Sequence, residues 1–264
     1  MGYPSMSLAS WAKSWLAGEA SPDDLVDALH EWAPLHVVRA SDPVVAGRVG
    51  IEWPDPEIDG ITVLIKTIRA GAGGTAGGLR LILPAPGDVR GLPPGTGFAS
   101  AALAAGEGVL LGTGGAAGTG IVPTPSGADV LEWSCFDTPI PLAVDDETLG
   151  DIEYRLRAAV RDAADVVASV HRTAIANRDF DVRGAIEDEL AELHHHRLPE
   201  SLSPRARRVL DSADQLAAIL TVAKTASVSS PTSLSANTIQ DETLRPLWDA
   251  IRLARMAAVN SGDR

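Results

Sequence analysis

The chain has 264 residues, 45% of them hydrophobic and 22% charged, which excludes wholesale disorder and leaves room for a substantial core. Its formal net charge of −13 opposes close approach to nucleic-acid phosphates and to anionic lipid, so we expect no nucleic acid and no membrane as partners. Cys135 is the only cysteine, which excludes an intramolecular disulfide and any metal site built from several cysteines.

The sequence also carries no visible targeting segment. Residues 1–20 lack a basic stretch followed by an apolar run, which is the pattern of a secretory signal. The longest apolar stretches are interrupted by charges and fall short of the roughly 20 apolar residues that span a bilayer. We therefore expect a soluble, cytoplasmic protein.

The pattern of the sequence changes near residue 145. Before it, short β-rich runs are separated by Gly and Pro, and after it the chain is Ala-rich, charged and helical in pattern. This predicts an α+β protein, with a mixed or antiparallel sheet and N-terminal helices, followed by a C-terminal bundle of long helices. We expect a sheet region at 1–144 and a helical region at 145–264, either separate or integrated into one domain.

The chain is predicted to begin with two helices. Trp11 and Trp15 lie one helical turn apart and share a face. Ser21 followed by Pro22 is typical of a helix start, because Ser caps the first turn and Pro fits its first position. The second helix is expected to end before Pro34.

Seven β-rich runs and one short helix are predicted next. The run Ile61–Arg69 has the strongest strand pattern and is expected to be central, with both faces covered. Phe98–Ala105 is the helix candidate. The predicted strands are Leu35–Ala40, Val44–Trp53, Ile61–Arg69, Leu79–Leu83, Val109–Leu111, Gly120–Val122 and Val130–Phe136.

A long helix is predicted from about Asp145, because apolar residues recur at alternating steps of three and four for about three heptads. The seam consists of Leu149, Ile152, Leu156, Ala159, Ala163, Val166 and Val170. Alanine in its middle permits close helix approach. We therefore expect an interaction surface for a protein partner or for self-association, formed by Leu149, Ile152, Leu156, Ala159 and Ala163.

Three further helices are predicted in the C-terminal part. One covers Val182–His196, and the next begins at Ser203-Pro204, again a cap followed by proline. The last carries apolar residues from Leu247 to Ala258 on one face. Pro246 marks either the first turn of this helix or a kink if the helix begins earlier.

Two glycine-rich tracts have the composition of phosphate loops. Gly71–Gly78 lies between two predicted strands, whereas a phosphate loop requires a helix directly behind it, so we expect a hairpin loop. Gly112–Ala117 fits G-x-G-x-x-A, but further glycines and prolines follow it, so we expect a mobile loop. Neither tract is expected to bind a cofactor.

The remaining chemistry-bearing residues form no converging set in the sequence. Three consecutive side chains such as His194–His196 point about 100° apart on a helix, so they cannot share one ion, and we expect no metal site. His30 and His36 flank one turn and could lie near each other. Cys135 lies in an aromatic run and is expected to be a small buried residue. We predict no catalytic residue.

Basic residues provide the alternative to a purely structural reading. Lys66, Arg69, Arg80 and Arg90, with Asp88, could gather at one end of the sheet and hold a small anionic ligand. Alternatively, these basic residues are simply exposed to solvent or form ion pairs with the many carboxylates, and bind no ligand. The Pro-rich segment Pro84–Pro94, which contains Asp88 and Arg90, is either a functional loop or a connector.

Several short motifs resemble an uncharacterised protein family of actinobacteria. They are Leu81–Pro93, Phe98–Glu107, Gly120–Pro123 and Leu244–Leu247. The resemblance covers most of the chain and implies a cytosolic actinobacterial protein. It transfers no catalytic or binding residue.

These observations favour a non-catalytic interaction or regulatory protein over an enzyme. The alternative is a binder or enzyme for a small anionic ligand, which would use the basic end of the sheet.

Overall fold

The computed structural model describes residues 2–142, 148–161, 181–228 and 234–261. They form two compact units that interleave along the chain. The sheet unit comprises Gly2–Asp145, His196–Ser203 and Val259–Arg264, and the helical unit comprises Asp146–His195 and Pro204–Ala258. The chain therefore passes from one unit to the other repeatedly.

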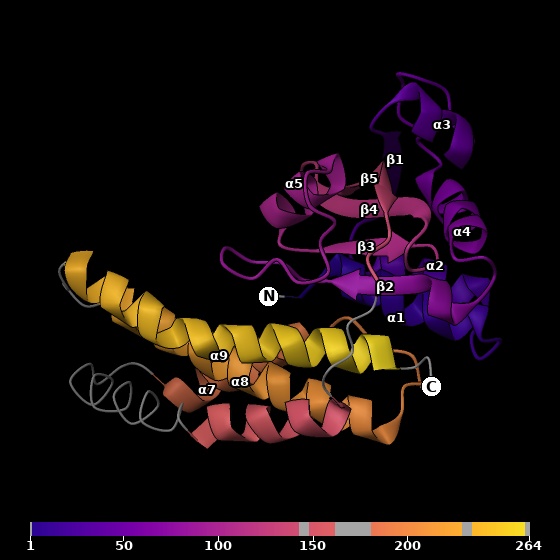
Figure 1. Ribbon diagram of the computed structural model, residues 1–264. Coiled ribbons are helices and arrows are strands. Elements are labelled where there is room, and N and C mark those ends of the chain that lie inside the picture. The colour runs from indigo at the N-terminus through magenta and orange to yellow at the C-terminus, as the bar shows by residue number, and fades with distance from the viewer. Residues whose placement is uncertain (1, 143–147, 162–180, 229–233, 262–264) are drawn as a thin grey trace. The chain divides into compact units, whose positions relative to one another are not determined.

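Within the described residues, five strands form one mixed sheet in the order β1-β5-β4-β3-β2 (Figure 1). β1 runs parallel to β5, and the other neighbouring strands are antiparallel. The strands are β1 (Leu35–Ala40), β2 (Leu79–Ile82), β3 (Gly108–Leu111), β4 (Ala117–Pro125) and β5 (Val130–Pro139). This confirms the predicted α+β class, and five of the seven predicted strands lie within or closely match these elements.

The strand predicted at Val44–Trp53 is wrong, because Pro43–Val49 forms helix α3. The Asp42 carboxylate accepts hydrogen bonds from two N–H groups of the first turn, both at 2.9 Å. Gly50 ends the helix in a left-handed conformation with φ 79°. The Asp-Pro start and the Gly stop are helix signals that outweigh the strand propensity of three valines.

The predicted central strand at Ile61–Arg69 is also wrong, because Gly60–Gly71 forms helix α4. Leu64, Thr67 and Ile68 are buried along one side of this helix, at the three- and four-residue spacing of a helical face. The β-branched residues of this run favour a strand by propensity, but the helical conformation places these three side chains on one buried face.

The other predicted elements of the sheet unit are confirmed. They are α1 (Pro4–Leu16), α2 (Pro22–His30) and α5 (Gly97–Ala105). Ser21 caps α2 as expected, and Asp24 completes a capping box with it.

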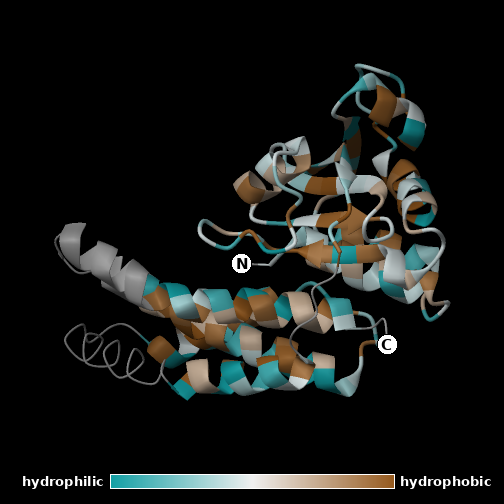
Figure 2. Cartoon of the chain, viewed as in Figure 1, coloured by the Kyte–Doolittle hydropathy of each residue, from teal (hydrophilic) through white to brown (hydrophobic). Residues whose placement is uncertain are grey.

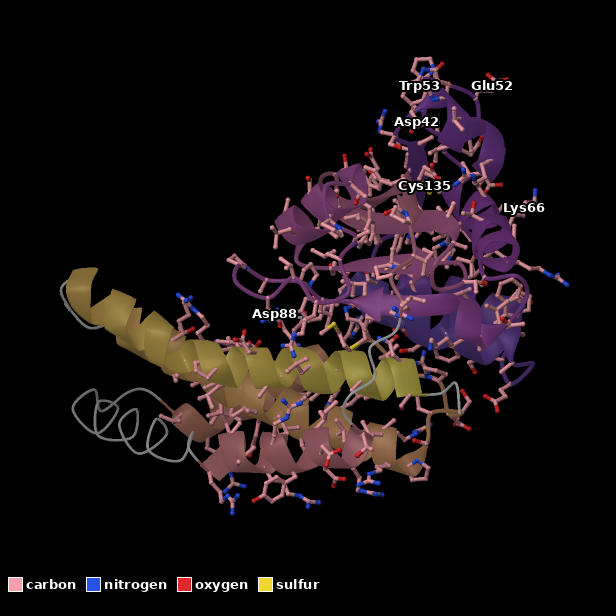
Figure 3. All side chains as sticks on the ribbon, viewed as in Figure 1. Asp42, Glu52, Trp53, Lys66, Asp88 and Cys135 are labelled. Atoms are coloured by element: carbon pink, nitrogen blue, oxygen red, sulfur yellow. The ribbon has the colours of Figure 1, made fainter. Side chains whose placement is uncertain are left out.

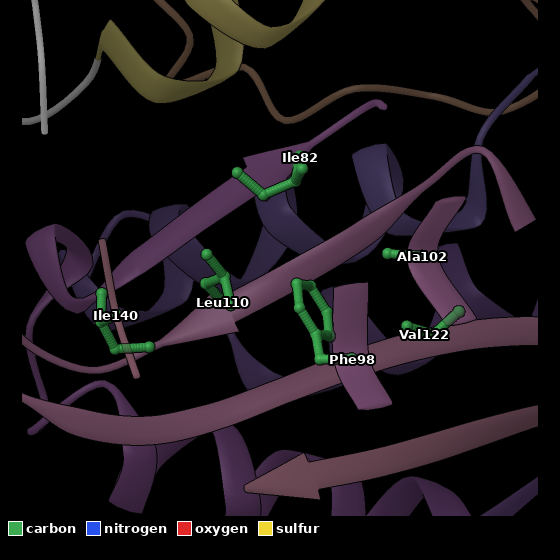
Figure 4. Close-up of a cluster of buried hydrophobic side chains, with 6 residues drawn as sticks. All are labelled: Ile82, Phe98, Ala102, Leu110, Val122 and Ile140. Atoms are coloured by element: carbon green, nitrogen blue, oxygen red, sulfur yellow. The ribbon is translucent and has the colours of Figure 1, made fainter. Parts of the chain in front are cut away.

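α5 covers one face of the sheet. Phe98 packs directly over Gly120 of β4, where an added Cβ would lie 2.2 Å from the ring, so any larger residue would displace the helix. The buried cluster on this face consists of Ile82, Phe98, Ala102, Leu110, Val122 and Ile140 (Figure 4).

α4 packs on the opposite face. Leu110 belongs to the α5 cluster, whereas the next residue, Leu111, meets Gly71 of α4, where an added Cβ would lie 2.9 Å from its side chain. Trp133 of β5 and Val38 of β1 pair side by side on this face, and both are fully buried. Helices therefore protect both sides of the central strands.

The helical unit contains residues 149–161, α7 (Val182–Leu193), α8 (Pro204–Val228) and α9 (Leu234–Asn260). Apolar residues alternate with polar ones along these helices (Figure 2). Pro246 lies inside α9, so of the two alternatives the helix begins earlier than this proline. The predicted C-terminal helical bundle is confirmed. Among the helices of the described residues, none combines the length and apolar content that crossing a bilayer requires.

A buried ion pair joins α8 to α9 inside the helical unit. The Arg255 guanidinium donates to the Asp214 carboxylate from Nε at 3.1 Å and from a terminal nitrogen at 2.5 Å. The Arg255 side chain is only 2% exposed. Replacing either partner alone would remove this ion pair and leave the other charge buried, which is costly.

The outer edge of β2 is closed by a side chain. The Leu81 N–H donates to Asn260 Oδ1 at 2.9 Å, and Asn260 Nδ2 donates to the Leu81 carbonyl at 3.0 Å. The carboxamide thus supplies the donor and the acceptor that a sixth strand would supply. This blocks part of an edge that could otherwise pair with another chain.

Asn260→Asp should lower the free energy of unfolding by about 1–3 kcal/mol, because the carboxylate cannot donate to the Leu81 carbonyl and places a second acceptor against it. Urea denaturation of the full chain measures the loss. Gln215→Glu, the same amide-to-acid change at an exposed position of α8, is the control and should cost at most about 0.5 kcal/mol. Equal losses in the two variants would contradict the role of Asn260.

Candidate functional site

Residues 42–59, which we call the edge segment, connect β1 to α4 along the free edge of β1. The Val38 N–H donates to the Glu57 carbonyl at 3.0 Å, and the Glu57 N–H donates to the Val38 carbonyl at 2.9 Å. At the start of α4, Gly60 lies so close to His36 that an added Cβ would be 2.5 Å from its carbonyl oxygen. The edge segment is therefore fixed to the sheet at its C-terminal end and by α3 at its N-terminal end.

The edge segment exposes three large apolar side chains. Val44 is 69% exposed, Trp53 46% and Ile58 73%. Single exposed apolar residues are ordinary on protein surfaces. Three of them on one short, fixed segment, including a tryptophan, are instead typical of a recognition surface.

The same segment is strongly acidic. Its carboxylates belong to Asp42, Glu52, Asp55, Glu57 and Asp59. Its one basic residue, Arg48, donates to Asp137 of β5 at 2.6 Å. Asp42, Glu52 and Trp53 lie at the same end of the sheet unit (Figure 3). The exposed tryptophan thus belongs to a segment with an excess of negative charge.

Asp42 keeps its charge while it caps α3. The Val45 N–H is the main cause that holds the pKa of this carboxyl below its usual value, with the Ser41 hydroxyl and the Val44 N–H adding to the effect. A helix N-terminus favours the ionised form for the same reason. The hydrogen bonds that cap α3 therefore also favour the negative charge of Asp42.

Cys135 has the environment of a structural residue. It is fully buried in β5, as the sequence predicts, and burial raises the pKa of its thiol to about 12. A thiol is a nucleophile only as the thiolate. Cys135 therefore stays protonated and unreactive at neutral pH.

His36 is held as a neutral imidazole in the core. Trp133 Nε1–H donates to His36 Nδ1 at 2.9 Å, so the proton lies on Nε2, which donates to the Leu29 carbonyl at 3.1 Å. Burial is the main cause that lowers the pKa of His36, and the nearby His30 lowers it further. The His30 and His36 rings lie 5.8 Å apart, so the expectation that they are neighbours is confirmed. Both ring nitrogens of His36 are committed to structure.

Glu107 caps α1 from a distant point of the chain. Its Oε2 accepts the Ser5 N–H at 2.7 Å, and the side chain is buried to 8% exposure. Tyr3, at the N-cap of α1, provides no side-chain cap of its own. Burial raises the pKa of Glu107 to about 7, and the hydrogen bonds from Ser5 oppose this shift. The helix start therefore depends on a carboxyl that titrates near neutrality.

Glu107→Gln should change how stability depends on pH. Below the ordinary Glu pKa of 4.5, the carboxyl is neutral in both the folded and unfolded states, and its contribution to stability is complete. That contribution is lost as pH rises toward about 7, because the unfolded state ionises first. The variant cannot ionise, so its stability relative to wild type should increase between these two pH values and then level off.

Chemical denaturation across that pH range measures this difference. Glu19→Gln, at an exposed position, is the matched control and should show no such trend. A difference between wild type and Glu107→Gln that does not vary with pH would contradict the assignment.

The structure does not bring the predicted anion-binding residues together. Lys66 and Arg69 are exposed on α4, and the guanidinium of Arg80 on β2 donates to a backbone carbonyl at 3.1 Å. Asp88 and Arg90 bond each other, at 2.7 Å and 2.8 Å. Lys66 and Asp88 lie on opposite sides of the sheet unit (Figure 3). Asp88 and Arg90 are paired with each other, and Lys66 and Arg69 are three residues apart on α4.

The predicted helical seam is turned inward where it is described. Ile152, Leu156 and Ala159 are 7%, 1% and 8% exposed, and Leu149 is half-buried. Ala163, like Val166 and Val170, lies outside the described residues. Most of the described seam therefore packs within the chain.

The glycine tracts act as connections. Gly71–Gly78 joins the end of α4 to β2 through a 3-10 turn at Ala76–Gly78, so the predicted hairpin between two strands is wrong. Gly112–Ala117 joins the antiparallel strands β3 and β4. A strand follows each tract, so neither faces a helix N-terminus.

The histidine run is divided between different environments. His194 ends α7, and the ring of His196 stacks on Trp32 with 3.5 Å between ring centroids. No group of three or more His, Cys, Asp or Glu side chains that could hold a metal occurs within the part of the chain that the structure describes.

The edge segment was not predicted from the sequence, because the valines of Val44–Trp53 favour a strand. In a strand, half of these side chains would face a core. The signal that was available is Asp42-Pro43, which predicts a short helix and leaves Trp53 and Ile58 on a loop rich in proline and carboxylates.

Comparison with known proteins gives a consistent picture. Residues 5–147 match the family model described as Rv1486c-like protein, N-terminal domain, and residues 150–256 match Rv1486c-like protein, C-terminal domain. The chain is 39% identical to "Uncharacterized protein Rv1486c" of Mycobacterium tuberculosis over 283 residues, covering 99% of this chain and 97% of the relative. It is 38% identical to "Uncharacterized protein ML1804" of Mycobacterium leprae over 291 residues, with the same coverage. No solved structure matches the chain.

Proposed function

Given that this chain belongs to the Rv1486c-like family, we propose that it is a non-catalytic interaction protein whose edge segment binds a basic, partly apolar segment of a protein partner. The relatives are described as uncharacterised, so the family supplies no activity and the function is unknown. The proposal rests on one observation, the exposure of Trp53 and Ile58 on the same acidic, backbone-fixed segment.

The chemistry of the edge segment selects the partner. Five carboxylates against one arginine favour lysine and arginine side chains and disfavour acidic ones, because like charges across an interface are costly. Trp53 and Ile58 add apolar area that only a partner with apolar side chains would cover. Tryptophan is among the residues that most often dominate binding energy.

The fixed backbone supports binding as well. The hydrogen bonds between Val38 and Glu57 and the cap at Asp42 hold the segment before a partner arrives. Less conformational entropy is therefore lost on association than for a free loop.

The state of the buried groups supports a non-catalytic role. The Cys135 thiol is protonated, and both nitrogens of His36 are hydrogen-bonded within the core. Glu107 is committed to the start of α1. Each of these groups is explained by a structural contact, so none is left to perform chemistry.

We also propose a cytoplasmic location for this function. A single, fully buried cysteine that is free of any disulfide is compatible with a reducing compartment.

Trp53→Ala should weaken binding of a basic, apolar peptide by about 2 kcal/mol, or roughly thirtyfold, because it removes the largest of the exposed apolar side chains of the edge segment. The probes are three labelled synthetic peptides of equal length: one of Lys, Arg, Leu and Phe, one with Glu in place of the bases, and one with Ser in place of the apolar residues. Fluorescence anisotropy with the full chain should show tight binding only for the first, weakening with added salt.

Leu142→Ala provides the matched control, since Leu142 is 71% exposed but lies outside the edge segment. It should leave the affinity unchanged. Equal binding of the acidic peptide, or an affinity that does not depend on Trp53, would rule out the edge segment as the binding surface.

A further inference from the structure

The helix formed by residues 149–161 in the helical unit has two sides of different character. Its inward side carries Ile152 and Leu156, which are buried within the chain. Its outward side carries Tyr154, which is 67% exposed, and Val160, which is 42% exposed. At 3.6 residues per turn, the buried and exposed side chains lie on opposite sides of the helix. The outward side is therefore a surface that the packing of the chain leaves uncovered.

Arginines accompany the exposed apolar side chains on this side. Arg157 follows Tyr154 and precedes Val160 at steps of three residues, so the three side chains form one row along the helix. Arg161 lies one turn beyond Arg157 and is exposed as well. Among the residues that the structure describes, none forms an ion pair with Arg161. We call the set of Tyr154, Arg157, Val160 and Arg161 the outer helix face.

The carboxylates of this helix do not cancel the charge of the outer helix face. Glu153 is shared by two guanidinium groups, because Arg157 and Arg205 both donate to its carboxylate. Asp151 accepts the Thr148 N–H at 3.0 Å and the Thr148 hydroxyl at 2.7 Å, so it caps the start of the helix. The outer helix face thus combines exposed apolar area with an excess of positive charge.

The edge segment has the opposite charge and a similar apolar content. Glu52 and Asp55 lie close to Trp53 in the sequence and are exposed, and neither forms an ion pair with another described residue. Glu52 and Trp53 lie at the same end of the sheet unit (Figure 3). Guanidinium groups bind carboxylates and also stack on aromatic rings, so an exposed arginine suits both features.

We propose that the partner of the edge segment is a second copy of the same chain, which binds through its outer helix face. This inference rests on the proposed function, because it names the occupant of that same surface. The chain carries a net charge of −13, so two copies repel each other except where a positive surface meets a negative one. The outer helix face supplies the basic and apolar side chains that the edge segment selects.

The contact between the two copies is head-to-tail, because its two surfaces are different. Each copy offers one edge segment and one outer helix face, so the copies join into a closed ring or an open chain. A contact between two edge segments is disfavoured, since it would bring like charges together. The association should weaken with added salt, which screens the attraction between exposed charges.

Sedimentation equilibrium of the full chain over a wide concentration range tests the proposal. Wild type should associate, and Arg161→Glu should raise the dissociation constant at least tenfold, because a carboxylate then faces the acidic edge segment of the other copy. Arg183→Glu is the matched control, since the Arg183 side chain is 89% exposed on α7 and the change in net charge is the same. It should leave the association unchanged.

Mixing two variants tests the head-to-tail arrangement. Trp53→Ala impairs the edge segment but keeps the outer helix face, and Arg161→Glu does the reverse. Neither variant alone should associate at concentrations at which wild type does. An equimolar mixture should form pairs, because one intact surface of each kind remains. Circular dichroism confirms that each variant is folded.

A wild-type monomer at all concentrations overturns the proposal, as do equal losses in Arg161→Glu and Arg183→Glu. A mixture of Trp53→Ala and Arg161→Glu that stays monomeric overturns it as well. The basic, apolar peptide separates this inference from the proposed function. If wild type is monomeric but binds that peptide through Trp53, the edge segment has a different partner and only this inference fails. If the peptide does not bind either, both fail.

Discussion

The parallel pairing of β1 with β5 is the contact on which the sheet unit depends. β1 is made early in the chain, yet its partner in the described sheet is β5, which it meets along Leu35–Ala40 and residues 130–135. The bond from Trp133 to His36 joins the same two strands within the core. Because β5 occupies one side of β1, only its outer edge is available to hold the edge segment. The exposure of Trp53 is therefore a consequence of strand order as well as of local sequence.

A second constraint comes from the way the chain returns to the sheet unit between α7 and α8. The Trp11 indole N–H donates to the Arg197 carbonyl at 2.9 Å, and Ser14 and Ser201 share a hydrogen bond at 2.6 Å. His196 stacks on Trp32 nearby. Residues 196–203 are thus part of the packing around α1, although the helices on either side of them belong to the helical unit. The sheet unit takes its structure from three separate stretches of chain.

The sequence predicted the fold class well because its strongest signals are local. The Ser21 cap, the Gly-Pro punctuation of the meander and the heptad pattern after residue 145 each act within a few residues. A boundary at 144/145 stays a prediction, and a fragment ending there would lack residues 196–203. The two errors in the sheet unit have one cause, since strand propensity was preferred to helix caps at Asp42 and to the buried stripe Leu64–Ile68. The candidate site depended on the first of these errors.

Features made by distant residues were beyond sequence reasoning. Nothing local indicates that Glu107 meets Ser5, or that Asn260 meets Leu81. The placement of Lys66 and Arg69 on a helix and of Arg80 on β2 follows from the helical state of α4, which composition does not reveal.

The closure of β2 by Asn260 has a consequence for biosynthesis. Asn260 lies 179 residues after Leu81, so a ribosome working at about 5–20 residues per second needs roughly 10–35 s to deliver it. During that interval the outer edge of β2 is unprotected in a nascent chain whose strands have already formed. Such an edge can pair with another nascent chain on the same mRNA. The fold can protect this part of the β2 edge with Asn260 only after α9 has been translated.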